Sequence, residues 1–383
     1  MVRKVYMDFL RRQAGAGRLG WILGLGAQYV LTKLSFLVRR PWCGPILGTL
    51  VTNYECNLRC RMCRLPEGGR LLPRETRNAL STEGMRAVID GFASLGTRGI
   101  GFTGGEPMLR PDLFHLMRHT RDRGMLTHLN TNGTLLDEAA SRAVLEAGVD
   151  SLNVSLDGAT EATHDRIRGV PGAFARTLES IRRIDRMRKK AGAPLRLKVV
   201  AVLSEDNLDE VPETLRLGAE LGVDCVEFIP RQPFPEGPGK GVPAGPALLA
   251  KVDAAVRLLG DRSSLPLPLE NSPGMLALFV PSFRGDPSPL TCHAGYNSLA
   301  VDCYGRIYPC VPYVNWNRPV GQLDGKGLRE FWYSREYGPA RREIARCHAC
   351  TLNCQAELNL LFQPLARIDP GKPSRDSRNA AAR

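Results

Sequence analysis

Between residues 47 and 235, short runs of apolar and β-branched residues alternate with longer stretches in which apolar residues recur at helical spacing. The first pattern predicts strands and the second predicts amphipathic helices. The expected strands are residues 47–55, 99–104, 125–133, 151–158, 195–203 and 224–230. Repetition of a strand followed by a helix predicts an α/β fold. Its parallel sheet, joined by right-handed crossovers, is either open or curved into part of a barrel.

Each expected strand ends in a polar or glycine-rich cluster, and the carboxyl ends of parallel strands meet at one edge of the sheet. The clusters are "CNLRCRMC" (56–63), "TGGEP" (103–107), "NTNG" (130–133), "SLDG" (155–158) with Arg168 beyond it, and "SEDN" (204–207). We therefore expect thiols, a carboxylate, a guanidinium and several amide or hydroxyl groups to face a single cavity.

The formal net charge of +13 over 383 residues raises the question of a nucleic-acid partner. The charge is concentrated at the two ends of the chain. Residues 1–46 hold eight basic residues and one acidic residue, and residues 361–383 hold five basic and two acidic residues, so everything between them carries only +3. The middle of the chain is no basic surface, and a nucleic-acid partner is not expected.

The cysteines indicate metal ligands. There are 11 of them, an odd number set in clusters, which favours metal binding in a reducing, cytoplasmic compartment over disulfides. Cys56, Cys60 and Cys63 have the spacing C-x3-C-x2-C, which leaves a four-ligand site one ligand short. Zinc is the alternative, but the trio lacks a second C-x2-C pair or a nearby histidine. The spacing alone does not say what fills the remaining position.

The ordered set "CNLRCRMC", "TGGEP", "TNG" and "SLDG" resembles the radical S-adenosylmethionine (SAM) enzymes over about half of the chain. The resemblance implies that Cys56, Cys60 and Cys63 hold three irons of a [4Fe–4S] cluster and that SAM chelates the fourth. It also implies a partial (β/α)6 barrel with a small C-terminal α+β iron–sulfur extension.

The same resemblance implies which residues contact SAM. Gly104, Gly105 and Glu106, where two glycines expose backbone N–H and C=O groups, would bind the methionine ammonium, with Glu106 as the charged acceptor. Ser155 and Arg168 would reach the carboxylate or ribose, since a guanidinium binds a carboxylate through two hydrogen bonds. A turn residue and a surface ion pair are the alternatives for these two. The other expected contacts are Met62, whose thioether would pack on adenine, Asn132 and Asn207.

A second group of cysteines follows a proline-rich stretch. Cys292-x12-Gly305-x4-Cys310, followed by a C-x2-C pair, resembles the SPASM or twitch extension, whose cysteines hold auxiliary [4Fe–4S] clusters. The longer SPASM form has seven cysteines and two clusters, whereas this chain has five cysteines in the corresponding places. We therefore predict one auxiliary cluster. The expected ligands are Cys292, Cys310, Cys347 and Cys350, with Cys354 replacing one of them or serving a partial second site. A structural zinc ion is the alternative.

The N-terminal stretch 18–40 is apolar with basic flanks, but Lys33, Gln28 and three glycines make it a poor membrane span. We expect a helix that covers the main domain and buries its apolar side chains, Trp21, Leu25 and Phe36 among them. The alternative is a basic amphipathic helix lying on the inner face of a membrane.

These patterns divide the chain into five parts. They are a basic N-terminal segment (1–46), the partial barrel (47–235), a linker (236–290), the auxiliary-cluster domain (291–360) and a disordered tail (361–383). Within the fourth part, residues 298–311 predict a β-hairpin with Gly305 at its turn.

The reaction that the resemblance implies is reductive cleavage of SAM to a 5′-deoxyadenosyl radical, which abstracts hydrogen from the substrate. An auxiliary cluster predicts an oxidation, because the substrate radical can lose its electron to that cluster. The expected substrate is a peptide or protein side chain or a small molecule, and the expected partner is a reductant such as flavodoxin or ferredoxin. Two alternatives stay open: a membrane-associated enzyme that modifies a lipid or lipid-linked substrate, and a non-catalytic iron–sulfur electron carrier.

Overall fold

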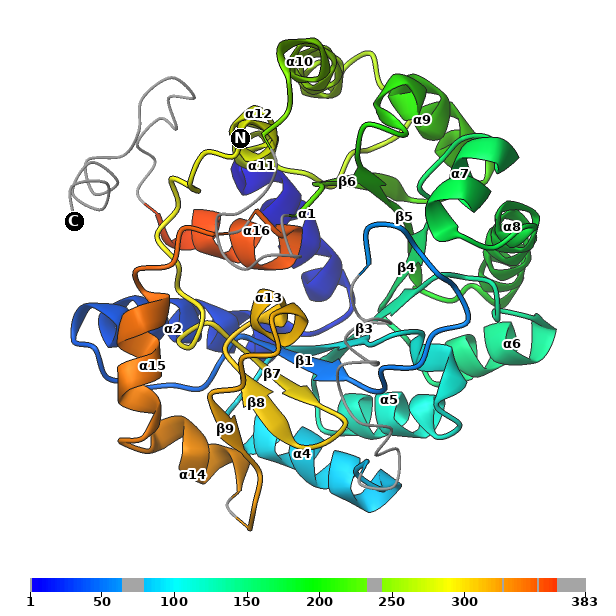
Figure 1. The fold of residues 1–383 in the computed structure, drawn as a ribbon. Helices are drawn as coiled ribbons and strands as arrows, with labels where there is room; N and C mark the ends of the chain where they lie inside the picture. Colours follow the sequence, from blue (N-terminus) through cyan, green and yellow to red (C-terminus); the bar gives the residue numbers. More distant parts are fainter. Residues whose placement is uncertain (1, 64–78, 233–242, 326, 350, 364–383) are drawn as a thin grey trace.

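A single mixed sheet forms the centre of the protein in the computed structural model, which describes residues 2–63, 79–232, 243–325, 327–349 and 351–363 (Figure 1). Within these residues the sheet has nine strands in the order β6-β5-β4-β3-β2-β1-β7-β8-β9. The first six are β1 (Leu47–Val51), β2 (Gly99–Thr103), β3 (Leu126–Thr131), β4 (Ser151–Ser155), β5 (Arg196–Leu203) and β6 (Cys225–Pro230). They are parallel and neighbour one another in chain order, as the expected βα repeats require.

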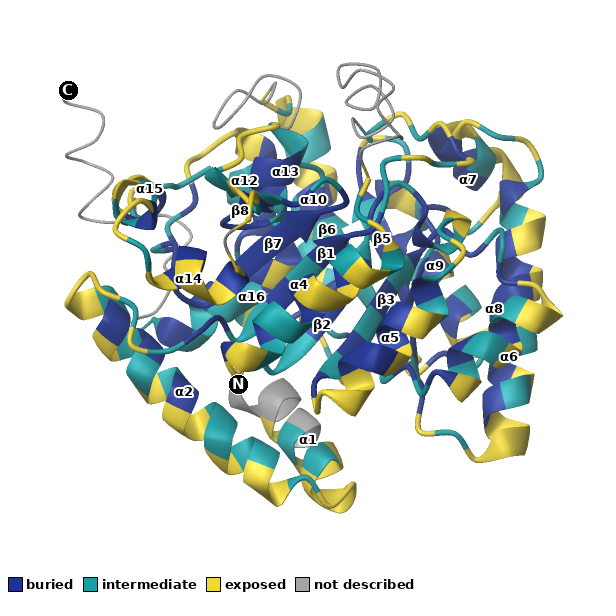
Figure 2. Ribbon diagram, turned by 90° about the horizontal axis from the view of Figure 1, so that it is seen from below, coloured by how far each residue is buried: buried dark blue, intermediate teal, exposed yellow. Residues whose placement is uncertain are grey.

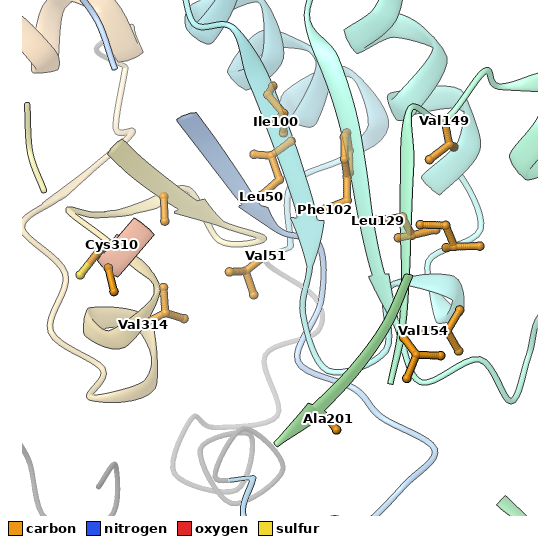
Figure 3. Packing of buried hydrophobic residues seen from close by; sticks show 14 of the residues in the cluster. Leu50, Val51, Ile100, Phe102, Leu129, Val149, Val154, Ala201, Cys310 and Val314 are labelled. Carbon is orange, nitrogen blue, oxygen red and sulfur yellow. The ribbon is translucent and has the colours of Figure 1, made fainter. Parts of the chain in front are cut away.

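Helices cover the outer face of these six strands. They are α4 (Thr82–Ser94), α5 (Leu113–Asp122), α6 (Glu138–Glu146), α7 (Glu161–Arg168), α8 (Ala173–Ala191) and α9 (Val211–Glu220). The core lies between the two layers, where Ile100, Phe102, Leu129 and Val154 are fully buried (Figure 3). Ser81 caps α4 by accepting a hydrogen bond from Gly84 N at 3.2 Å, as its sequence position predicts. The sheet curves but does not close, so the predicted partial barrel is confirmed.

The C-terminal extension continues the same sheet. It contributes β7 (Ser298–Asp302), β8 (Arg306–Tyr308) and β9 (Gly321–Gln322), of which β7 pairs in parallel with β1. Strands β7 and β8 form the predicted hairpin, with Gly305 at a φ of 77° in its turn. Around it pack α13 (Val311–Asn315), α14 (Leu328–Tyr333), α15 (Tyr337–Ile344) and α16 (Asn353–Phe362).

The region expected to be a linker, 236–290, contains helices. They are α10 (Pro246–Gly260), α11 (Pro273–Leu276) and α12 (Phe279–Arg284). Val252, Leu259 and Phe279 are fully buried in the core. The prolines that suggested a linker begin α10 and α11, where proline is tolerated because the first N–H of a helix has no partner to lose.

Two N-terminal helices, α1 (Val2–Gly15) and α2 (Leu19–Leu37), lie across the end of the barrel where the strands begin (Figure 2). Gln28 Oε1 accepts a hydrogen bond from Arg98 Nε at 2.9 Å, just before β2, and Arg18 Nη1 lies 3.1 Å from Asp150 Oδ1, just before β4. The carboxyl ends of the strands, with the candidate site, lie at the opposite end. Over the described residues, no helix has the length and apolarity needed to cross a membrane.

Candidate active site

Cys56, Cys60 and Cys63 lie in the loop that follows β1, and all three thiols are partly exposed. The loop is held on the end of α7: Arg59 N and Arg61 N donate to the carbonyls of Arg168 and Ile167 at 3.0 and 2.9 Å. These two hydrogen bonds anchor the backbone on either side of Cys60 to the end of α7.

Arg168 provides a fixed positive charge beside this loop. Its Nη1 lies 3.7 Å from Cys60 Sγ, and its Nη2 forms an ion pair with Asp157 Oδ2 at 2.7 Å. Burial acts to lower the pKa of Arg168, but the neighbouring Asp157 and Cys60 outweigh it and raise that pKa. Its Nε is buried without a hydrogen-bond partner among the described residues. Arg168 is therefore no surface ion pair, and a donor remains for a ligand.

The glycines of "TGGEP" serve a close contact between two backbones. Gly105 N and Glu106 N donate to the carbonyls of Asn53 and Glu55 at 3.0 and 2.7 Å, so these N–H groups are not open to a ligand as expected. A Cβ on Gly105 would lie 2.0 Å from Glu55 O, and one on Gly104 would lie 2.6 Å from Asn53 O. The segment thus supports the backbone that leads into Cys56.

Glu106 is more constrained than the sequence suggested. Its side chain is buried, its Oε1 accepts from Met108 N and Thr131 Oγ1, and its Oε2 accepts from Asn132 N at 2.8 Å. Burial raises the pKa of Glu106, and these hydrogen bonds oppose that shift. A carboxylate has about four lone-pair positions. Three are used within the protein, which leaves room for one further donor.

The other expected SAM contacts fall into two groups. Asn132 and Asn207 are buried and their amides are engaged: Asn132 Nδ2 donates to Asn57 Oδ1 at 2.8 Å, and Asn207 Nδ2 donates to Asp157 O at 2.8 Å. Both therefore hold neighbouring loops in place; Asn207 Nδ2 uses both of its hydrogens, with Val202 O as the second acceptor at 2.8 Å, whereas a single donation from Asn132 Nδ2 is found among the described residues. Ser155, at the end of β4, and Met62, between two of the cysteines, keep part of their surface exposed.

The barrel interior is polar toward the amino-terminal ends of the strands, away from the mouth. His128 on β3, Asn153 on β4 and Lys198 on β5 point away from the outer helices, because side chains alternate across a strand. Asn153 Nδ2 donates to His128 Nε2 at 2.9 Å, and Lys198 Nζ lies 3.6 Å from Glu227 Oε2 and 3.5 Å from Glu270 Oε1. Burial, with Lys198 nearby, lowers the pKa of His128 to about 3, so this imidazole is neutral.

Nearer the mouth the interior becomes apolar. Val200 and Val202 on β5 and Ile229 on β6 are partly exposed, whereas their neighbours Val199 and Phe228 are fully buried against the outer layer. The inner positions of these strands thus keep contact with solvent. The arrangement offers a substrate an apolar entrance and a polar end with balanced charge.

The auxiliary cysteines gather around α13. Cys292 and Cys310 are buried and Cys347 is partly buried. Burial raises the pKa of Tyr313, and Cys347, Glu343, Cys310 and Cys292 add to the shift, so all three cysteines lie close enough to act on its hydroxyl. Cys310 is the residue that precedes α13, and Figure 3 shows it beside Val314 of that helix. Cys350 lies outside the described residues.

Cys354, in the first turn of α16, differs from these three. Its side chain is exposed, yet burial among surrounding groups and the charge of Glu227 raise its pKa to about 12. Both observations hold if the thiol faces solvent within the barrel, since Glu227 lies on an inner strand position. Cys43, Cys225 and Cys303 belong to neither cysteine group.

A carboxylate that the sequence did not single out joins the two cysteine regions. Asp302, at the end of β7, is fully buried and accepts hydrogen bonds from Tyr54 and Tyr308 at 2.8 and 3.1 Å and from Arg306 Nε at 2.7 Å. Tyr54 lies two residues before Cys56, and Tyr308 lies two residues before Cys310. Asp157 was missed as well, although its place in "SLDG" at a strand end could have indicated it.

A family comparison agrees with this geometry. The radical SAM superfamily model matches residues 50–218, and the SPASM iron–sulfur cluster-binding domain matches residues 292–355. An AdoMet-dependent heme synthase of Methanosarcina barkeri is 40% identical over 295 residues, which cover 73% of this chain and 80% of the relative. A PqqA peptide cyclase of Ruegeria pomeroyi is 32% identical over 305 residues, covering 76% of this chain and 74% of the relative. The chain belongs to the radical SAM superfamily and carries a C-terminal SPASM domain.

Solved structures share the fold. SuiB of Streptococcus suis bound to S-adenosylmethionine has a TM-score of 0.61 at 18% identity, covering 78% of this chain and 68% of that one. The structure of anSMEcpe with bound AdoMet and a Cp18Cys peptide has a TM-score of 0.56 at 20% identity, covering 79% and 83%. The protein is therefore a radical SAM enzyme, with SAM and [4Fe–4S] clusters as its cofactors.

The residues present fit these cofactors. Thiolates are the usual cluster ligands, and a guanidinium next to Cys60 offsets the negative charge that a thiolate-bound cluster brings. Among the residues that the structure describes, no three His, Cys, Asp or Glu side chains converge closely enough to hold a single metal ion. The ligands of a [4Fe–4S] cluster lie farther apart than those of a single metal ion, because each thiolate binds a different iron.

Proposed function

We propose that this enzyme removes a hydrogen atom from a substrate held in the barrel interior and completes an oxidation through the auxiliary site. Cys56, Cys60 and Cys63 hold the SAM-binding cluster, and a one-electron donor such as a flavodoxin or ferredoxin reduces it. One auxiliary cluster is held by Cys292, Cys310, Cys347 and Cys350, with Cys354 as the alternative ligand. With these groups bound, the protein gains reductive cleavage of SAM to methionine and a 5′-deoxyadenosyl radical.

One observation carries the proposal. Strands β1 and β7 are parallel neighbours, with Val51 paired to Asp302, so the loop that carries Cys56, Cys60 and Cys63 and the hairpin that leads to Cys310 start at adjacent positions of the sheet (Figure 1). The two regions therefore lie at the same end of the sheet, at the carboxyl ends of β1 and β7. Loss of a hydrogen atom to the 5′-deoxyadenosyl radical, which becomes 5′-deoxyadenosine, of one electron to the auxiliary site and of one proton to water or a base would balance a two-electron oxidation of the substrate.

The protein's own groups divide the remaining tasks. Arg168, held by Asp157, and Ser155 bind the carboxylate or ribose of SAM, and Met62 packs on its adenine. The carbonyls of Gly104 and Gly105 and the remaining lone pair of Glu106 receive its ammonium. Asn132 and Asn207 act indirectly: their hydrogen bonds hold the loops that carry the groups in contact with SAM.

A peptide or protein side chain is the first candidate substrate. Its support is the named activity of the PqqA peptide cyclases and the structure of SuiB bound to its precursor peptide SuiA. The lining offers an apolar entrance for a side chain and a charge-balanced polar end for backbone groups. An iron-porphyrin is the second candidate, because the relative that is 40% identical is named a heme synthase.

The test is anaerobic production of 5′-deoxyadenosine. The protein is reconstituted with iron and sulfide, reduced with dithionite and supplied with SAM, in parallel with Cys60→Ala and with Cys43→Ala as a matched control. We expect product from the wild type and from Cys43→Ala and none from Cys60→Ala. Full iron loading and SAM binding without product, with or without the candidate substrates, would favour the non-catalytic electron carrier.

Substrate choice needs a second readout. Adding PqqA-type precursor peptides or Fe-coproporphyrin III separately and following substrate mass distinguishes the two candidates, since each oxidation removes hydrogen from one of them only. Cys310→Ala is expected to keep 5′-deoxyadenosine formation while losing the oxidised product. Retention of that product by Cys310→Ala would contradict the auxiliary role.

A further inference from the structure

Helix α2 buries a polar face and exposes an apolar one, the reverse of an ordinary surface helix. Its buried residues are Gln28, Thr32 and Ser35. Gln28 Nε2 donates to the carbonyls of Gly44 and Pro45 at 2.9 and 3.1 Å, and Ser35 Oγ accepts from Trp42 N at 2.8 Å. Specific hydrogen bonds therefore hold α2 on the barrel, together with aromatic contacts along its sides.

The outer face of α2 carries a continuous apolar stripe. Its members recur at spacings of three, four or seven residues and are Leu19, Leu23, Val30, Leu34 and Leu37. Leu23 and Leu37 are 75% and 74% exposed, and Val38 and Trp42, which follow the helix in the chain, are 45% and 54% exposed. At about 1.5 Å per residue the stripe is about 27 Å long. Scattered exposed leucines are normal, but an exposed stripe along a whole helix indicates a binding surface.

The expectation that α2 buries its apolar residues holds for one side only. Trp21, Leu25 and Phe36 are partly buried, and Phe36 packs on Tyr296 with ring centroids 5.4 Å apart. Tyr29 stacks on Phe362 of α16 at 4.9 Å. The five residues of the stripe lie on the opposite side and gain nothing from these contacts.

The charge around the stripe favours one kind of partner. Residues 1–46 carry a net charge of +7, and Asp8 is their only acidic residue. Arg39 and Arg40 are exposed just beyond the helix, and Lys33 lies beside the stripe with its Nζ 4.8 Å from the Tyr29 ring centre. A second copy of the chain, related by a two-fold axis, would bring the same positive charges together. The C-terminal segment 361–383, at +3, has the same sign.

We propose that α2 docks the enzyme on the surface of a membrane rich in anionic lipid. The apolar stripe enters the boundary between headgroups and acyl chains, and the basic residues contact lipid phosphates. The helix lies in the plane of the surface, in agreement with the absence of a membrane-crossing helix among the described residues. The barrel mouth is at the opposite end of the molecule. The lipid is therefore a docking surface and not the group that is oxidised, which separates this inference from the proposed function.

The test is flotation of the full-length protein with vesicles. Vesicles rich in phosphatidylglycerol are compared with pure phosphatidylcholine vesicles, at low and high sodium chloride. We expect binding to the anionic vesicles only, weakened by salt because exposed charges are screened. Equal recovery with both vesicle types, or none with either, would overturn the proposal.

Matched variants distinguish binding through the stripe from non-specific adsorption to vesicles. Leu23→Glu should reduce partitioning by about tenfold or more, since it removes a large apolar side chain from the interface and adds a charge. Leu109→Glu, at an exposed leucine far along the chain from α2, should bind as the wild type does. Arg39→Gln with Arg40→Gln should lower binding by about tenfold, and Arg142→Gln with Arg216→Gln, which removes the same net charge elsewhere, should not.

One further outcome decides between a membrane and a second copy. Sedimentation could show a wild-type dimer that the Leu23→Glu substitution dissociates. If the wild type also fails to bind anionic vesicles, the stripe is a self-association surface and the lipid proposal is wrong. A monomer that binds vesicles through Leu23 supports it.

Discussion

At Gly105 the structure leaves no space for a side chain. We expect Gly105→Ala to weaken iron and SAM binding, because its Cβ would lie 2.0 Å from Glu55 O and would push the two backbones apart just before Cys56. The cost should be about 1–3 kcal/mol, as for other overpacked sites. Iron content and the dissociation constant for SAM are the measurements. Gly101→Ala is the control, since the nearest atom to its Cβ is 3.9 Å away; equal losses in both variants would contradict the assignment.

Arg168 acts through the shape of its side chain as well as its charge. We expect Arg168→Lys to bind SAM about tenfold more weakly or worse, because an ammonium cannot reach Asp157 and Cys60 together and still offer a donor to the ligand. Calorimetric titration with SAM, at matched iron content, measures the change. Arg166→Lys on the same helix, whose partner Asp206 is at the surface, should bind normally.

Glu357 on α16 makes stability depend on pH. Burial, with Glu227 and Glu270 adding to it, raises its pKa from 4.5 to about 7. Between these values the folded state binds more protons than the unfolded state, so this group's contribution to the free energy of unfolding falls as pH rises. Above the folded pKa the loss is complete and amounts to about 3 kcal/mol.

Glu357→Gln should therefore stabilise the protein at about pH 8 and have little effect below about pH 5. The amide oxygen can still accept the hydrogen bond from Ser272 N, found at 2.8 Å. Denaturant unfolding at several pH values, compared with the exposed-site control Glu220→Gln, gives the difference. A gain that is the same at every pH would show that packing, and not titration, is responsible.

At the scale of elements, the β7–β8 hairpin is fastened to the β1 loop by one carboxylate. Asp302→Asn should lower the free energy of unfolding by about 3 kcal/mol or more, because Arg306 would remain in place without its charged partner. Tyr54→Phe removes one hydrogen bond to the same group and should cost about 1 kcal/mol. Unfolding curves and iron content check both. An unaltered unfolding free energy in Asp302→Asn would mean that packing alone holds the hairpin.

Element prediction from the sequence succeeded where a strong local signal existed. All six barrel strands appear within the predicted ranges, although β1 ends at Val51, where the loop toward Cys56 begins. Helices α10 and α11 escaped prediction because their first-turn prolines looked like breaks in structure. The domain boundaries stay a prediction, and the segment 364–383 lies outside the described residues.

The list of residues in the candidate site stays a prediction, and the sequence indicates their positions at the strand ends better than their tasks. The cysteine spacing and the strand-end clusters place the groups at one mouth by topology alone. Whether Asn132, Asn207 and Glu106 face a ligand or hold a loop depends on hydrogen bonds between residues far apart in sequence, which have no local signature. The parallel pairing of β1 with β7 is likewise invisible to local patterns.

At the scale of the whole molecule, that pairing makes the two cysteine regions parts of one sheet. A chain that ended before residue 298 would keep six parallel strands but would leave the β1 edge bare. We expect such a truncated protein to aggregate, since an uncovered strand edge pairs readily with other chains. Light scattering of the truncated and full-length proteins at equal concentration would show it.

The same pairing sets an order of events during synthesis. Strand β1 emerges from the ribosome long before β7, its partner some 250 residues later, so one side of the sheet waits unpaired for most of translation. The barrel can assemble early from local strand–helix units, but the iron sites cannot be brought together until the last fifth of the chain has been made. Delivery of iron and sulfide to the auxiliary site is thus a late step, and a supply that fails at that moment would leave a folded barrel able to bind SAM but unable to finish an oxidation.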